Sequence, residues 1–173
     1  MIYSTKDWQS LELLQSMATK PSQRRTAEGD YPSALSARVG FLLAKAHQVA
    51  LEETERVLTE FGLSRKGYAA LATVVTDAPI SQQRLSQRIG MDPATMVDVI
   101  DTLEESGYLE RRRNPNDRRE YALRATPKGK ALFAQAQRAV IGAESRAFRG
   151  LDPDEVRQLS DLLARVAAPS DHL

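Results

Sequence analysis

The most constraining feature of the chain is a change of hydrophobic period near residue 107. Before it, apolar residues recur every three or four positions, as in amphipathic helices; from 108 to 125 they alternate, as in strands. The helical part includes two short segments, 81–89 and 92–106, separated by a turn at Gly90. The alternating part is interrupted by the turn-forming residues 114–117. Helix, tight turn, helix and immediate hairpin predict a helix-turn-helix followed by a wing.

Capping signals predict where the helices begin. Ser64, Ser81 and Asp92 precede periodic segments, and a proline follows Asp92 at the first helical position, where its missing N–H costs nothing. Asp152 and Glu155 have the spacing of a capping box. With long helices over 33–61 and 127–149, the expected order is four helices, a hairpin and two helices. The expected fold class is mainly α with a small β-hairpin wing, a winged helix-turn-helix joined to a helical dimerisation region.

The same pattern predicts which side chains face inward. In the helix 92–106 the inward set is Met96 or Val97, together with Ile100 and Leu103. In the hairpin, Leu109, Tyr121 and Leu123 supply the apolar face.

Apolar helical stripes predict self-association. The helices 33–61, 127–149 and 153–167 carry more apolar surface than one small winged domain can cover, and pairing across a two-fold axis would bury it. A homodimer would bind two half-sites, so the operator is expected to be an inverted repeat. The expected parts are an N-terminal extension with a short helix and linker (1–32), a dimerisation helix (33–62), the winged helix-turn-helix (63–126), C-terminal dimerisation helices (127–168) and a tail (169–173).

Charge placement points to double-stranded DNA, although the formal net charge is only +1. Residues 108–126 hold six arginines against three carboxylates, and an arginine at the tip of a narrow hairpin fits a minor groove. The helix 92–106 instead carries five carboxylates and no basic residue, but its first turn is small enough to approach base edges. Asp98 is expected to accept from a cytosine amino group or to pair with Arg84 or Arg88. The expected DNA contacts are Ser81, Gln82, Arg84, Arg88, Pro93, Ala94, Thr95, Asp98, Arg111, Arg113, Asp117, Arg118 and Arg119.

Four stretches carry a family resemblance. Met91–Val97, Ile100–Arg112 and Asn116–Arg119, followed by Leu123–Gly129, resemble the MarR (multiple antibiotic resistance regulator) family. The resemblance implies a homodimer with interlocking terminal helices, a recognition helix at 92–106 in the major groove and Arg119 of an Asp-x-Arg wing motif in the minor groove. It also implies a ligand crevice between the dimer helices and the winged domain. Asp98 departs from the pattern, because many members carry a neutral or basic residue there.

The extension resembles that of the urate-responsive branch, in which an extra N-terminal helix contributes a tryptophan to the ligand site; Trp8 would match it. Lys66 and Gly67 stand near where that branch has an arginine and an aspartate, so the correspondence is incomplete. A small aromatic or phenolic anion is the expected ligand of a repressor that releases DNA on binding it. Its expected lining is Trp8, Phe41, Lys45, His47, Tyr68 and Arg88.

Other classes of protein are disfavoured. The chain has two histidines and none of the common catalytic or nucleotide-binding motifs, so an enzyme, a cofactor and a metal site are not expected. It has no cysteine, which excludes disulfides and thiol-based oxidation sensing. No membrane segment or signal peptide is apparent, and a cytoplasmic location is expected. The alternative function is a winged helix used only for protein–protein contact.

Overall fold

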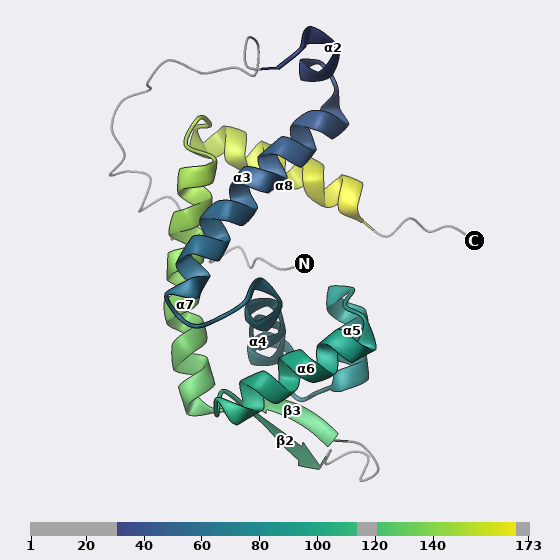
Figure 1. Ribbon diagram of the computed structural model, residues 1–173, viewed down its shortest axis with the longest axis vertical. Helices are drawn as coiled ribbons and strands as arrows, with labels where there is room; N and C mark the ends of the chain where they lie inside the picture. Colours follow the sequence, from purple (N-terminus) through teal and green to yellow (C-terminus); the bar gives the residue numbers. More distant parts are fainter. Residues whose placement is uncertain (1–30, 114–120, 169–173) are drawn as a thin grey trace, which may run out of the picture. The chain divides into compact units, whose positions relative to one another are not determined.

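The computed structural model describes residues 31–113 and 121–168. The chain divides into two compact units, which are described separately: one contains residues up to Glu53 and from Ile141 onward, the other Thr54–Val140. Helices α3 (Val39–Thr59) and α7 (Pro127–Ala147) each contribute to both units (Figure 1). The expected helix around Trp8, the turn of the wing and the C-terminal tail lie outside the described residues.

The unit Thr54–Val140 holds the helix-turn-helix and the wing, which confirms the predicted fold class. Helices α4 (Arg65–Asp77), α5 (Gln82–Ile89) and α6 (Pro93–Glu105) pack together beside a three-stranded antiparallel sheet (Figure 1). The strands are β1 (Ile80–Ser81), β2 (Leu109–Arg113) and β3 (Tyr121–Ala125), in the order β1-β3-β2. The two-residue strand β1 extends the expected hairpin. It was not predicted, because two residues are too few to show a period.

The predicted caps are present. The side chains of Ser64, Ser81 and Asp92 accept hydrogen bonds from the backbone N–H three residues on, at 3.0, 3.3 and 2.8 Å. In α8 (Pro153–Ala167) both hydrogen bonds of the capping box between Asp152 and Glu155 are formed, each at 2.9 Å. Each cap satisfies backbone donors that the first helical turn leaves without partners, which is why these boundaries could be predicted from single residues.

A continuous apolar core fills this unit. The side chains of Leu71 in α4, Leu85 in α5 and Ile100 in α6 are completely buried, and Leu109 and Leu123 close the core from the sheet. Met96 is buried and Val97 is 41% exposed, which decides between the two predicted inward residues. Tyr121, expected to face inward, is 59% exposed, because it pairs with Arg113 at the end of the ladder farthest from the buried pairs.

The other unit contains α2 (Ser33–Ser36), the beginning of α3, the end of α7, and α8. The prediction of one helix over 33–61 is wrong at its start. The N–H of Arg38 donates to the carbonyl of Leu35 at 2.9 Å, a tight i to i−3 turn that ends α2 before α3 begins. Gly40, in the first turn of α3, weakens helical propensity at this point.

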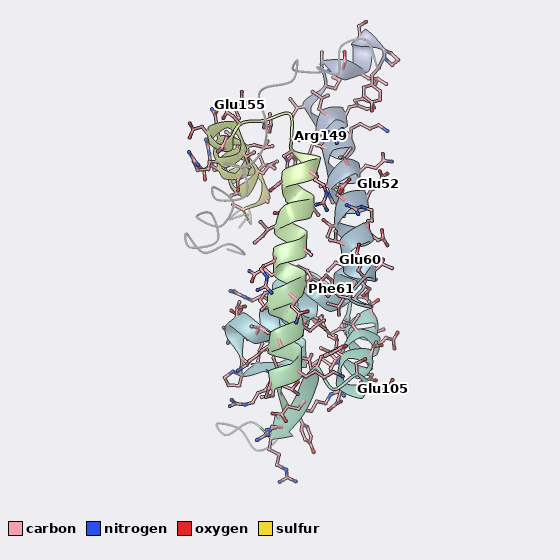
Figure 2. All side chains as sticks on the ribbon, turned by 90° about the vertical axis from the view of Figure 1, so that its left-hand side faces the viewer. Glu52, Glu60, Phe61, Glu105, Arg149 and Glu155 are labelled. Carbon is pink, nitrogen blue, oxygen red and sulfur yellow. The ribbon has the colours of Figure 1, made fainter. Side chains whose placement is uncertain are left out.

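This second unit buries little apolar surface of its own. Glu53 of α3 pairs with Arg146 of α7 at 2.9 Å, and Figure 2 shows α3, marked by Glu52, beside the end of α7, marked by Arg149. No residue of α8 is buried. Among the residues of this unit that the structure describes, nine large apolar side chains are exposed, including Val39 at 79% and Val166 at 78%; the others are Tyr31, Leu35, Leu42, Leu43, Val49, Leu151 and Leu162.

Over the described ranges, no helix combines the length and apolar character that crossing a membrane would require.

Candidate nucleic-acid interface

The turn between α5 and α6 is held in one geometry by backbone and side-chain hydrogen bonds. Gly90 ends α5 with φ +66°, a left-handed conformation that favours glycine. The buried hydroxyl of Ser86 donates to the carbonyl of Met91, whose N–H donates back to the carbonyl of Ser86 at 3.0 Å. The two helices of the motif are thereby fixed to each other. Ser86 was missed by sequence reasoning, since a serine inside a short helix carries no distinctive signal.

The first two turns of α6 present small, apolar and acidic side chains to solvent. Pro93, Ala94, Val97 and Asp98 are exposed, and Thr95 is half-buried. Asp92 sits at the N-cap, where the hydrogen bond from the Thr95 amide holds the pKa of its carboxyl below the ordinary value. This end of α6 therefore offers a surface free of long side chains, which a base edge can approach closely.

Arg111 joins the base of the wing to α6. Its guanidinium donates to Asp101 at 2.5 Å and to Glu104, its backbone N–H donates to Glu104 at 3.2 Å, and Gln82 of α5 lies 3.5 Å away. The side chain is 28% exposed. Alternation along β2 explains this: Arg111 lies on the same face as the buried Leu109 and so points toward α6, whereas Arg112 points to the other face.

The cluster changes the charge of the α6 surface. Burial disfavours the charged guanidinium, but the hydrogen bonds and negative charges of Asp101 and Glu104 outweigh it and raise the pKa of Arg111. Two of the five carboxylates noted in the sequence are thus paired with one cation, and Asp92 is engaged as a cap. Asp98 and Glu105 are left, and Glu105 is the last residue of α6 (Figure 2).

The remaining wing residues are only partly described. Arg112 pairs with Glu110 on its own strand at 2.7 Å. Arg113 is exposed at the end of β2. The expected DNA contacts Asp117, Arg118 and Arg119 lie outside the described residues.

The expected contacts on α5 have different surroundings. Arg84 is exposed, whereas Arg88 pairs with Asp77 at the end of α4 at 2.7 Å. Of the alternatives expected for Asp98, pairing with Arg88 is not found, because a carboxylate on α4 holds that arginine. Ser81 is occupied as the cap of α5.

A tight junction connects the end of α6 to the start of α7. The hydroxyl of Thr126 donates to the carbonyl of Gly107 at 2.7 Å and accepts from the N–H of Gly129 at 3.0 Å. A Cβ on Gly129 would lie 2.0 Å from the carbonyl oxygen of Tyr108. Lys128 donates to the carbonyl of Ser106 at 2.9 Å, with its ammonium 4.7 Å from the ring centre of Tyr108. The glycine is required by close approach, which the sequence alone does not show.

The expected ligand residues that the structure describes are divided between the two units. Phe41 and Lys45 lie together in α3, where the Lys45 ammonium is 5.8 Å from the ring centres of both Phe41 and Tyr31. Tyr31 and Phe41 pack edge to face at 5.1 Å. Tyr31 was not predicted, because it follows a polar linker and belongs to no periodic stripe.

The other ligand candidates have separate places. His47 is exposed on α3. Tyr68 belongs to the other unit and packs against Phe133 with ring centres 5.9 Å apart, and Arg88 is held by Asp77. Trp8 lies outside the described residues. No group of three or more metal-ligating side chains occurs in the described parts of the chain.

A helix-turn-helix with a rigid turn, a small-residue face at the start of its second helix and a wing fastened to that helix define a winged-helix protein of the DNA-binding type. Comparison with known proteins gives the family. The model of the MarR family matches residues 63–121. The HTH-type transcriptional regulator YkoM of Bacillus subtilis (strain 168) is 31% identical over 132 residues, which span 76% of this chain and 86% of YkoM.

Solved structures of this family have the same fold. A MarR family transcriptional regulator from Rhodococcus sp. RHA1 superposes with a TM-score of 0.72 at 31% identity, over 80% of this chain and 99% of that one. CouR from Rhodococcus jostii RHA1, bound to p-coumaroyl-CoA, gives 0.71 at 30% identity, over 82% and 100%. CouR bound to a 23-mer DNA duplex gives 0.72 at 27% identity, over 78% and 96%. The chain belongs to the MarR family, whose members matched here are transcriptional regulators and not enzymes.

Proposed function

We propose that this protein is a homodimeric repressor that binds an inverted-repeat operator through α6 and the wing and releases it on binding a small aromatic or phenolic ligand. The observation that carries the DNA-binding part is the exposed, small-residue start of α6 beside a wing that Arg111 fastens to the same helix. CouR, which has the same fold and 27% identity, has been solved on a DNA duplex.

The DNA-contacting residues divide by role. Pro93, Ala94, Thr95 and Asp98 face the major groove, and Arg84 and Arg113 supply exposed cations for phosphates. Arg118 and Arg119, with Asp117 to orient them, enter the minor groove from the wing turn. Arg111, by contrast, positions the wing against α6, and Ser81 and Gln82 contact DNA mainly through the backbone of the start of α5.

DNA binding is tested by measuring the affinity of selected and random duplexes as a function of salt. Arg119→Ala should weaken binding and lower the slope of log K against log salt by about one, since one phosphate-site cation is lost. Arg165→Ala, on α8, is the matched charge control and should leave the slope unchanged. A folded protein that binds no duplex at low salt would instead favour the protein–protein alternative.

The exposed apolar side chains of α2, α3 and α8 support the proposed dimer. An isolated chain would leave Leu162 and Val166 on α8 in water, together with Val39, Leu42 and Leu43. Burying such a surface across a two-fold axis removes apolar area from water at about 25 cal/mol per Å². Light scattering should therefore give twice the chain mass. Leu162→Asp should reduce it, while Ala164→Asp, on the opposite side of α8, should not.

The ligand site is proposed at the cluster of Tyr31, Phe41 and Lys45, which combines two ring faces with a cation suited to an aromatic anion. CouR has been solved bound to p-coumaroyl-CoA. The probe is p-coumaroyl-CoA, with free p-coumarate in parallel. It should raise the melting temperature and release operator DNA, and Lys45→Met should reduce both effects, while Lys130→Met on α7 should not. An unchanged melting temperature and DNA affinity with both compounds would remove the phenolic-ligand part of the proposal.

A further inference from the structure

The outer face of α6 lacks every side chain that usually specifies a purine. Direct recognition of guanine depends mainly on arginine or lysine, and that of adenine on asparagine or glutamine, each as a bidentate contact. The helix sequence over 93–105 contains none of the four. The hydroxyl of Thr95 can contact any base and so adds little preference. The remaining preference contributed by the exposed side chains of α6 must come from apolar contacts or from an acceptor.

Val97 supplies the apolar contact. Among the described residues of its unit it is one of two exposed large apolar side chains, and the other, Tyr121, lies at the end of the wing sheet. Met96, its neighbour, is fully buried, so the helix rotation that seats Met96 in the core leaves Val97 at the surface. Ala94 lies one turn before it and is also exposed. In a major groove, the only apolar group on a base edge is the C5-methyl of thymine.

Asp98 supplies the acceptor. It is exposed next to Val97 and one turn after Ala94. Among the described residues it has no ion pair, because Arg88 is held by Asp77 and Arg111 by Asp101 and Glu104. An ionised carboxylate near DNA phosphates is repelled unless it faces a hydrogen-bond donor. Of the base edges, cytosine offers its amino group as a donor without a neighbouring acceptor on the same base.

We propose that α6 specifies pyrimidines: Val97, with Ala94, contacts a thymine methyl group, and Asp98 accepts a hydrogen bond from the amino group of a cytosine close to it. This inference rests on the proposed function, in which α6 lies in the major groove. Val97 and Asp98 lie three and four residues after Ala94, so both adjoin it on the helix surface. This closeness places the thymine and the cytosine within about two base pairs of each other. The guanine and adenine opposite them are selected only as their pairing partners.

The experiment begins with operators selected from random duplexes by the wild-type dimer. In the selected half-site, each thymine is replaced in turn by deoxyuridine, which removes only the C5-methyl, and Kd is measured by fluorescence anisotropy. At one thymine the wild-type protein should lose about fourfold in affinity, the factor expected for one buried methyl group. Val97→Ala should bind more weakly and lose that sensitivity, while it keeps any sensitivity to thymines elsewhere in the site.

Asp98→Asn gives an independent measurement. Asparagine pairs with adenine, so selection by this variant should change from cytosine to adenine at one position, with about tenfold discrimination. Asp161→Asn, on α8, is the matched control and should select the wild-type sequence. Both Val97 and Asp98 are exposed, so the variants should fold, and circular dichroism and melting temperature check this.

The outcomes distinguish failure of DNA binding from failure of the contacts assigned to Val97 and Asp98. A wild-type protein that binds no duplex would refute the proposed function itself. A protein that selects an operator but is indifferent to every deoxyuridine, or whose sensitivity survives in Val97→Ala, would overturn the assignment of Val97 while DNA binding stands. Unchanged selection by Asp98→Asn would overturn the cytosine contact.

Discussion

Replacing Arg111 with methionine keeps the length of the side chain and removes its charge. It leaves Asp101 and Glu104, now without a cation, on the helix proposed to enter the major groove. Hydrogen bonds to charged groups contribute about 1.5–3 kcal/mol each when buried. Because the two carboxylates are 47% and 37% exposed, water replaces part of that contribution. We expect the free energy of unfolding to fall by about 1–3 kcal/mol.

The effect on DNA affinity follows from the loss of one positive charge, because the cluster changes from a net charge of −1 to −2. A charge about 10 Å from a phosphate in water interacts with it by about 0.4 kcal/mol. Summed over the nearest few phosphates, the added repulsion reaches about 1 kcal/mol, or roughly a fivefold increase in Kd. Fluorescence anisotropy at several salt concentrations measures this increase, and chemical denaturation measures the loss of stability.

A rescue variant separates positioning from direct contact. In Arg111→Met/Asp101→Asn/Glu104→Gln the cluster is neutral, whereas in the wild type it has a net charge of −1. Operator affinity should therefore be at least that of wild type, and up to about fivefold higher, with an unchanged salt slope. If Arg111 itself contacts a phosphate, the triple variant stays weak and its slope is lower by about one. That result would refute the reasoning. Arg157→Met, which breaks an exposed ion pair with Asp154 on α8, is the control for loss of one arginine.

Three further predictions concern stability. Gly129→Ala should lower the melting temperature strongly or prevent folding, because its Cβ would overlap the backbone carbonyl of Tyr108. Gly142→Ala, in the same helix, meets only ordinary contacts and should stabilise the protein by about 0.5–1 kcal/mol. Thermal denaturation measures both effects. Ser86→Ala should reduce the free energy of unfolding by about 1 kcal/mol, since the part-buried carbonyl of Met91 loses its hydroxyl donor, and urea denaturation measures this. The pKa of Asp92 is lowered in the folded state, so its contribution to stability is complete above pH 3.8 and is lost as the pH falls through its lowered pKa. The melting temperature of Asp92→Asn should therefore depend less on pH in that acidic range than that of wild type. An identical pH dependence of the two proteins would contradict the role of the charge.

Parts of the candidate site could be predicted from single residues and others could not. The start of α6 was predicted from Asp92 and Pro93, since a cap satisfies its own helix. The partner of Arg111 was not predicted, although the alternation of Leu109 and Arg111 placed both on the inward face of β2. Naming Asp101 and Glu104 as its partners required the packing of β2 against α6, which no local pattern contains.

The sequence by itself determined the order of the elements, the caps, the turn at Gly90 and the family. These depend on hydrogen bonds within a few residues and on the period at which apolar side chains recur. Only the tertiary structure decided that Met96 and not Val97 is buried, that Arg88 pairs with Asp77, and that Gly129 has no room for a side chain. Each of these depends on the distance between segments far apart in the chain, and that distance is set by how the core packs.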